Sequence, residues 1–258
     1  MTAVAAHTWF MFVRHVMNLL RQPIWIFTLL TTPFVWLLLY SQLFRRVVEL
    51  PGFEGGSYVQ YLVPGIVVMT AFFTGAWNGM SMINDLDRGI VERFLATPAR
   101  RSSLVLGHVM QASVIGVLEG VIILGLGYAL GARVHAGIAG WVVVLVVAAL
   151  VAACFSGMSN GIALFARREE SMIALSNFIA LPLLFLSSVL MAEALMPAWI
   201  RTIAAVNPVN WGAVAAREAV QRGTDWAVVA TNLAPLLAVT AAMAAFATWS
   251  FRAYRRTL

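Results

Sequence analysis

Six long stretches of apolar residues dominate the sequence and predict its secondary structure. A hydrocarbon core about 30 Å thick is crossed by about 20 helical residues, and each stretch reaches that length. Water is absent there, so each stretch must satisfy its backbone hydrogen bonds internally, as a helix does. We therefore predict an all-α polytopic membrane protein with a single domain, residues 1–258. The predicted transmembrane helices are residues 24–44, 58–83, 104–130, 138–166, 172–191 and 226–251.

Two regions outside these spans also have helical patterns. Residues 5–22 place apolar side chains at spacings of three and four, which predicts an amphipathic helix lying in the membrane interface. A frayed extension of the first span is the alternative. Before the last span, a long apolar loop is interrupted by Pro197 and Pro208. Apolar loops of this kind dip partway into the membrane or pack on the ends of spans, so we expect short re-entrant helices near residues 198–206 and 211–222.

The distribution of arginine predicts the orientation of the helices. The chain has 61% hydrophobic and only 11% charged residues, and all 17 of its Lys and Arg positions are arginine. Loops rich in positive charge are retained in the cytoplasm. With the N-terminus inside, the inner segments hold 11 of the 17 arginines. The count favours a multi-pass protein with both termini in the cytoplasm.

The composition also excludes several kinds of chemistry. Without lysine, the chain lacks the residue with which a P-loop grips phosphate, so we expect no nucleotide-binding site in this chain. The one cysteine, Cys154, lies in an apolar run, which excludes an internal disulfide and a cysteine-based zinc site. His108 and Gln111 stand one turn apart without a third ligand nearby, so hydrogen bonding is expected there and no metal site is predicted. The net charge of +6 is explained by topology better than by nucleic-acid binding.

The loop of residues 84–103, between the second and third predicted spans, is the most informative segment. It combines seven charged residues with a small apolar set that shares one face of a helix. A short amphipathic helix of this kind lies on the membrane or fits a groove on a partner protein. Pro98 would end it, because proline disfavours helical geometry in the preceding residue. A solvated connector with ordinary flanking charges is the alternative.

Three motifs together resemble a known family of transporters. They are Tyr61-Leu-Val-Pro-Gly-Ile-Val-Val-Met-Thr70; Asp87-Arg-Gly-Ile-Val-Glu-Arg-Phe-Leu-Ala-Thr-Pro98 with Arg101 and Gly107; and Val206-Asn-Pro-Val-Asn-Trp211 with Arg217. Their order resembles the type-2 permeases of ATP-binding-cassette (ABC) exporters, and in particular the daunorubicin-resistance drug-efflux branch. The resemblance covers nearly the whole chain.

The resemblance implies a permease subunit of the bacterial cytoplasmic (inner) membrane that exports a hydrophobic drug or lipid-like substrate from the cytoplasm or inner leaflet. In this family two permease halves, identical or different, assemble with two ABC ATPase subunits. The chain would thus be no enzyme and hold no cofactor, while ATP and Mg bind to the partner ATPase. The alternatives are a permease for polysaccharide or lipid-linked glycan, a membrane-embedded lipid-processing enzyme, and an ion channel.

The resemblance also implies that the loop of residues 84–103 forms a coupling helix. Gly89, Glu92 and Arg93 would lie against the ATPase. Thr97, Pro98 and Arg101 would fix the turn into the third span. Glu92 and Arg93 are able to form charge-assisted hydrogen bonds there. The implied coupling residues are Gly89, Glu92, Arg93, Thr97, Pro98 and Arg101.

Two further sets of residues are candidates for function. Glu119 is the one charged residue inside a predicted span, and intramembrane carboxylates are costly unless they face a bundle interior or a watery path. It would contact a cationic drug, respond to protons, or form a structural hydrogen bond to a neighbouring helix. Asn207, Pro208 and Arg217 match the family's extracytoplasmic Asn-Pro motif. Gly157 and Gly161 permit close helix approach, and a seam between two permease halves is one use for them.

Overall fold

The computed structural model describes residue 17 and residues 23–43, 58–95, 102–166, 168–221 and 224–254. All regular secondary structure in these ranges is helical, as the apolar pattern predicts. The predicted interfacial helix at residues 5–22 lies outside the described residues, except for Met17. The elements are α2 (Pro23–Leu43), α3 (Tyr58–Trp77), α4 (Gly79–Asp87), α5 (Ile90–Leu95), α6 (Ser102–Ala129), α7 (Gly137–Ala166), α8 (Glu169–Phe185), η2 (Glu193–Leu195), α9 (Ala198–Ala204), α10 (Pro208–Glu218) and α11 (Trp226–Tyr254).

Four helical segments are long and apolar enough to cross a membrane. By length and composition they are Tyr58–Asp87, Ser103–Ala129, Gly137–Ala166 and Trp226–Ala253. These segments correspond to the second, third, fourth and sixth predicted spans. The first predicted span overlaps α2, which has 21 residues, and the fifth overlaps α8, which has 17. The chain is therefore a polytopic membrane protein, while the total of six spans stays a prediction.

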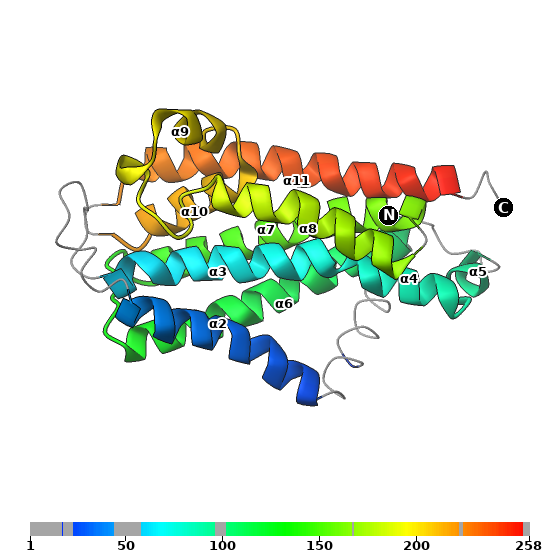
Figure 1. Cartoon of the computed structure of the whole chain (residues 1–258), viewed down its shortest axis with the longest axis horizontal. Coiled ribbons are helices and arrows are strands. Elements are labelled where there is room, and N and C mark those ends of the chain that lie inside the picture. The colour runs from blue at the N-terminus through cyan, green and yellow to red at the C-terminus, as the bar shows by residue number, and fades with distance from the viewer. Residues whose placement is uncertain are drawn as a thin grey trace.

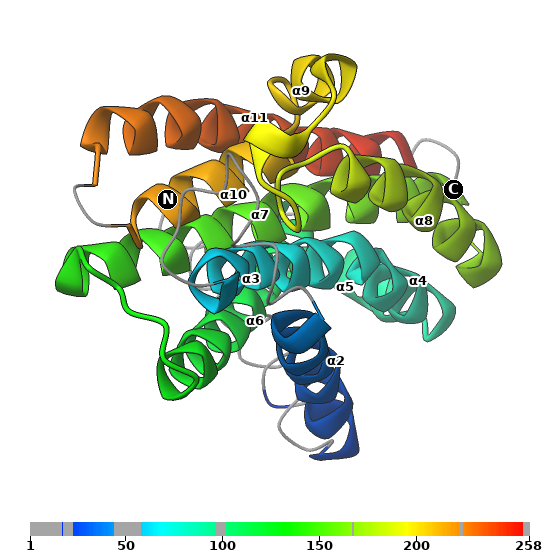
Figure 2. The same ribbon diagram turned by 60° about the vertical axis from the view of Figure 1, so that its left-hand side comes forward.

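Helix α7 is the centre of the bundle. It packs against α3, α6 and α11, and α4, α8 and α10 also contact it (Figures 1 and 2). Small residues allow these close contacts: a Cβ added to Gly157 would lie 2.8 Å from the backbone carbonyl carbon of Met243 in α11. The same addition at Gly161 would collide with the ring of Phe246. Gly157 and Gly161 therefore pack α11 against α7 within one chain.

Two short helices lie between α8 and α11, where the sequence predicts them. Helix α10 begins at Pro208, earlier than expected, because the side-chain oxygen of Asn207 accepts a hydrogen bond from the backbone N–H of Val209 at 3.0 Å. Asparagine before a helix and proline at its first position are both favourable. Helix α10 packs against α3, α7 and α11 at the end of the bundle opposite α5 (Figure 1), whereas α9 exposes Trp199 and Ile203.

The structure corrects two of the predicted spans. The second span is interrupted: α3 ends at Trp77, and α4 starts at Gly79 after a one-residue turn. The fifth span, predicted to reach residue 191, leaves helical geometry after Phe185. Apolarity alone predicted a longer helix because the side chains that hold the turn after α8 come from residues 207–217, far along the chain.

The buried apolar residues form two separate clusters. The larger cluster includes Phe72 of α3, Phe155 of α7 and Ala180 of α8. The smaller cluster joins the α4–α5 region to the adjoining ends of α6, α7, α8 and α11. Its buried members are Met82, Ile83, Val91, Leu104, Val105, Ala163, Leu164, Met172, Ala247 and Phe251. The bundle interior is therefore divided along its length.

Candidate functional site

Helices α4 and α5 form an elbow at one end of the bundle, and this α4–α5 elbow (residues 79–95) contains the predicted coupling residues that the structure describes. Gly89 has φ of 63°, a left-handed conformation that glycine adopts without steric cost, and it turns the chain between the helices. The backbone N–H of Gly89 donates to the carbonyl of Leu86, and that of Arg93 donates to the carbonyl of Gly89. The elbow is thus closed by its own hydrogen bonds.

The elbow buries an apolar side and exposes a charged one. Val91 is fully buried in the smaller cluster, whereas Asp87, Arg88 and Arg93 are exposed. This division agrees with the amphipathic pattern of the sequence. Glu92 belongs to α5, while the predicted turn residues Thr97, Pro98 and Arg101 lie outside the described residues. The structure therefore brings Gly89 and Arg93 to one charged surface and leaves the roles of all six residues as predictions.

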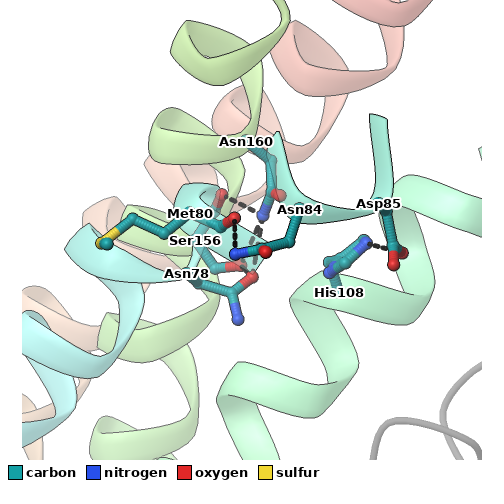
Figure 3. Close-up of polar contacts among 7 residues, drawn as sticks. All are labelled: Asn78, Met80, Asn84, Asp85, His108, Ser156 and Asn160. Atoms are coloured by element: carbon teal, nitrogen blue, oxygen red, sulfur yellow. Dashed lines mark hydrogen bonds and ion pairs between the residues drawn. The ribbon is translucent and has the colours of Figure 1, made fainter. Parts of the chain in front are cut away.

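Polar contacts tie α4 to two neighbouring helices. Asp85 and His108 are both buried, and their side chains approach to 3.3 Å between Oδ2 and Nε2 (Figure 3). The side-chain amide of Asn84 donates to the carbonyl of Met80 and, at 3.3 Å, to the carboxylate of Glu169 in α8. Because these contacts link α4 to α6 and α8, the elbow is held on more than one side.

A second polar group, the polar layer, surrounds the break between α3 and α4, and Figure 3 shows three of its members, Asn78, Ser156 and Asn160. It consists of the buried residues Asn78, Ser156, Ser159, Asn160 and Ser176. The side-chain oxygen of Asn78 accepts hydrogen bonds from Ser156 Oγ and Asn160 Nδ2, both at 2.9 Å. Ser176 of α8 donates to the carbonyl of Ala76 at 3.1 Å. Helices α7 and α8 thus supply hydrogen bonds to the break in the second span.

The Asn-Pro motif holds the irregular turn that follows α8. The side-chain amide of Asn207 donates to the carbonyls of Leu183 and Leu186 at 2.7 and 2.9 Å. The side-chain oxygen of Asn210 accepts from the backbone N–H of Ser188 at 2.8 Å. Backbone groups freed at the end of a helix need such partners when no water is near.

Arg217 completes this turn from α10. Its guanidinium is 7% exposed and donates to the Val189 carbonyl at 2.6 Å, to Ser188 Oγ at 3.0 Å and to the Ser188 carbonyl. It also donates to the Tyr61 carbonyl at 3.3 Å and lies over the Tyr61 ring, 3.8 Å from its centroid. Asn207 and Arg217, matched by the family motif, therefore meet around one turn, which they clamp against α3.

Glu119 lies in the interior of the bundle, facing α3. Its carboxylate is 2% exposed and accepts hydrogen bonds from Thr74 Oγ1 at 3.0 and 2.9 Å. On α3, which carries Thr74, the ring centroids of Phe73 and Trp77 are 5.5 Å apart, and Trp77 is half exposed. This contact is the hydrogen bond to a neighbouring helix that the structural alternative expects, while a contact with a cationic drug and a response to protons stay predictions.

Sequence reasoning missed Asn78, Ser156, Ser159 and Asn160 as a group. A signal was present, because three of them fall within five residues of an otherwise apolar span. Their partner Asn78, however, stands about 80 residues away along the chain.

Within the described part of the chain, no group of three His, Cys, Asp or Glu side chains could hold a metal ion.

The arrangement is that of a membrane transport subunit, a helical bundle with an amphipathic elbow at one end and a clamped turn near the other. Comparison with known proteins agrees: the profile of the ABC-2 type transporter family matches residues 6–220. The chain therefore belongs to the ABC-2 type transporter family.

Several relatives carry names that fit this family. The daunorubicin resistance ABC transporter permease protein DrrB1 of Streptomyces coeruleorubidus is 27% identical over 261 residues, covering 98% of this chain and 87% of that protein. The putative transport permease ycf38 of Cyanophora paradoxa is 27% identical, covering 75% of this chain and 67% of its own length. The inner membrane transport permease YadH of Escherichia coli K12 is 25% identical, covering 72% of each.

Proposed function

We propose that the chain is the membrane-spanning permease subunit of an ATP-driven exporter in the bacterial inner membrane. In this proposal a separate ABC ATPase binds ATP and Mg, and a second permease half, identical or different, completes the transport path. The observation that carries it is the α4–α5 elbow, which exposes Asp87, Arg88 and Arg93 while its apolar side is buried in the bundle. Movement imposed on this charged surface would be passed directly to the adjoining ends of α6, α7, α8 and α11, which share the smaller cluster with the elbow.

The absence of lysine supports a separate motor. A P-loop ATPase needs its lysine for the phosphates, and this chain has none. The exposed charges of the elbow suit charge-assisted contacts to such a partner, and its helices supply contact area. With Gly89 and Arg93 at this surface and Glu92 on the same short helix as Arg93, the elbow is the proposed coupling site on the cytoplasmic side.

The proposed substrate is a hydrophobic drug or lipid-like molecule. DrrB1 is named for daunorubicin resistance, and it aligns with nearly the whole chain. Within this proposal, Glu119 gives cationic substrates a polar contact.

Co-purification tests the assignment directly. The tagged permease, extracted from its host membrane, should retain an ABC ATPase, and the complex in proteoliposomes should hydrolyse ATP faster when a lipophilic cation or neutral drug is added. Purified permease that hydrolyses ATP without a second subunit would refute the proposal. A complex stimulated only by lipid-linked glycan would replace the proposed cargo.

The coupling surface is tested by the double variant Glu92→Ala with Arg93→Ala. It should reach the membrane at the normal level but lose substrate-stimulated ATP hydrolysis and export, because its charge-assisted contacts to the ATPase are gone. The matched control is Glu193→Ala with Arg201→Ala, which removes one exposed acid and one exposed base at the other end of the bundle. Unchanged export in the first variant at equal expression would contradict the coupling role.

A further inference from the structure

The break in the second span has a specific cause in the backbone hydrogen bonds. In a regular α-helix the N–H of Gly79 would donate to the carbonyl of Gly75, four residues earlier. Instead the N–H of Gly79 donates to Ser159 Oγ at 3.1 Å, and Ser159 Oγ donates to the carbonyl of Gly75 at 2.8 Å. The Ser159 hydroxyl of α7 is therefore inserted into the hydrogen-bond ladder of another helix, a recognised cause of kinks.

The surrounding residues are shaped for this insertion. A Cβ on Gly79 would lie 2.5 Å from the carbonyl oxygen of Ser159, and a Cβ on Gly75 would lie 2.5 Å from the carbonyl oxygen of Ala152. Only glycine lets the two backbones approach this closely on both sides of the break. The N–H of Asn78 bonds instead to the carbonyl three residues back, at 3.1 Å, so the helix tightens at the same point.

The break also lies between the two apolar clusters. Along the second span, Phe72 belongs to the larger cluster and Met82 to the smaller, with Asn78 between them. Along α7 the order is Phe155, the serines and asparagine of the polar layer, and then Ala163. On α8, Ser176 stands in the same way between Met172 and Ala180. The polar layer thus crosses three helices at one level.

We infer that Ser159 is a positioning residue that makes the second span a hinge, about which the α4–α5 elbow moves against the rest of the bundle. The inference rests on the proposed function, because the movement is the one that an ATPase would impose on the elbow. A ladder bond carried by a side chain is able to lengthen and reform without exposing an unpaired N–H or carbonyl to lipid. The polar layer keeps apolar side chains of the two clusters from interleaving at the break, so the elbow can move without opening the larger cluster.

Paired spin labels test the hinge. The labels replace the exposed residues Asn84 of α4, which lies outside the charged surface of Asp87, Arg88 and Arg93, and Ile138 at the far end of α7, in a Cys154→Ala background that removes the one native thiol. In lipid nanodiscs the label-to-label distance distribution should be narrower in Ser159→Ala, because Gly79 and Gly75 can then bond to each other. Ser250→Ala is the matched control, since Ser250 is equally buried but its hydroxyl donates to Phe246 of its own helix.

A functional measurement separates positioning from simple destabilisation. With the partner ATPase bound, the distance distribution should shift on ATP addition in the Ser250→Ala protein and shift much less in Ser159→Ala. The ratio of substrate-stimulated to basal ATP hydrolysis should fall in Ser159→Ala alone. A merely structural serine would lower the amount of complex without changing this ratio.

The outcomes distinguish the hinge from the proposed function. If the protein without these serine changes shows no ATP response, the proposed function fails, while the width of the nucleotide-free distribution still decides the hinge. If Ser159→Ala matches Ser250→Ala in width and response, the hinge is refuted. Should Ser159→Ala fail to fold, hydrogen exchange of the unmodified protein decides: amides 78–81 should exchange faster than amides 66–72 of the same span, and equal protection would overturn the inference.

Discussion

Replacing Arg217 with alanine should loosen the turn after α8 and lower the stability of the whole bundle. The guanidinium joins three elements, because it donates to carbonyls in α3 and in the 186–189 turn from its position in α10. In Arg217→Ala, the Val189 carbonyl loses this donor, whereas the Ser188 carbonyl keeps the hydroxyl of Tyr61 at 2.8 Å. The substitution therefore removes a hydrogen-bond donor from the Val189 carbonyl, while the Ser188 carbonyl keeps one.

The expected magnitude follows from these contacts. A buried carbonyl left without a donor costs about 1–3 kcal/mol, and a hydrogen bond from a charged group contributes about 1.5–3 kcal/mol. The cation–π contact with the Tyr61 ring adds about 1 kcal/mol. Relief of the cost of burying a guanidinium offsets part of this sum. We expect a net loss of about 3 kcal/mol, with a smaller loss in Arg217→Lys, which keeps the charge without the planar fork.

Thermal unfolding in detergent measures this effect. Samples heated stepwise and passed through a size-exclusion column give the temperature at which half of the monodisperse protein is lost. For a chain of this size, about 3 kcal/mol corresponds to a decrease in Tm of about 6–12 °C. The control is Arg201→Ala, an exposed arginine of α9, which should change the stability by less than about 0.5 kcal/mol.

Two results would refute this reasoning about Arg217. If Arg217→Ala shifted Tm no further than Arg201→Ala, the buried network would not stabilise the turn. If Arg217→Lys were as unstable as Arg217→Ala, the retained charge would make no measurable contribution.

Two other residues give sharp predictions. Gly75→Ala should destabilise the protein by about 1–3 kcal/mol, because the new Cβ would press on the Ala152 carbonyl, whereas Gly125→Ala, with nothing within 4 Å of its Cβ, should be neutral or slightly stabilising in the same heating assay. Equal stability of the two variants would contradict the close α3–α7 contact. Glu119→Gln should assemble normally, since the amide still accepts from Thr74, but export of lipophilic cations measured in vesicles should fall about tenfold relative to neutral substrates. An equal change for both kinds of substrate would leave Glu119 with a structural role.

Much of the fold could be predicted from length and apolarity. The third span, predicted at residues 104–130, corresponds to Ser102–Ala129, and the fourth, predicted at 138–166, to Gly137–Ala166. These helices are long, uninterrupted and apolar, so local pattern determines them. The start of α10 could also be predicted, because Asn207 and Pro208 form a favourable helix start. The helix was nevertheless predicted to begin a few residues later, at residue 211.

Where the structure departs from the predicted spans, the cause is a side chain far away in the sequence. The break at Asn78 depends on Ser159, 80 residues beyond Gly79, so the Asn78–Gly79 pair within residues 58–83 does not reveal it without that partner. The early end of α8 depends on Asn207, whose amide binds the carbonyls of Leu183 and Leu186. In both places an apolar run favours a continuous helix, and a side chain from another helix interrupts it.

In the candidate site, too, the local patterns were predicted from the sequence, whereas the contacts between helices were not. The amphipathic pattern of residues 84–95 is local, and the structure shows the buried Val91 and the exposed Arg93 that it requires. The pairing of Asp85 with His108 joins two helices, and hydrogen bonding was expected for the histidine without its partner being known. The polar layer was missed because its members come from three helices.

The packing of Gly157 and Gly161 against α11 limits how another membrane protein could attach to this chain. The face of α7 that carries these two glycines is already covered by α11, while α8 exposes large side chains such as Phe178 and Phe185, which are 78% and 68% exposed. Acyl chains compete well for bulky, irregular surfaces, because they fill the same gaps that a neighbouring helix would fill. Attachment through α8 would therefore vary with the thickness and fluidity of the surrounding bilayer, and detergent extraction would weaken it first.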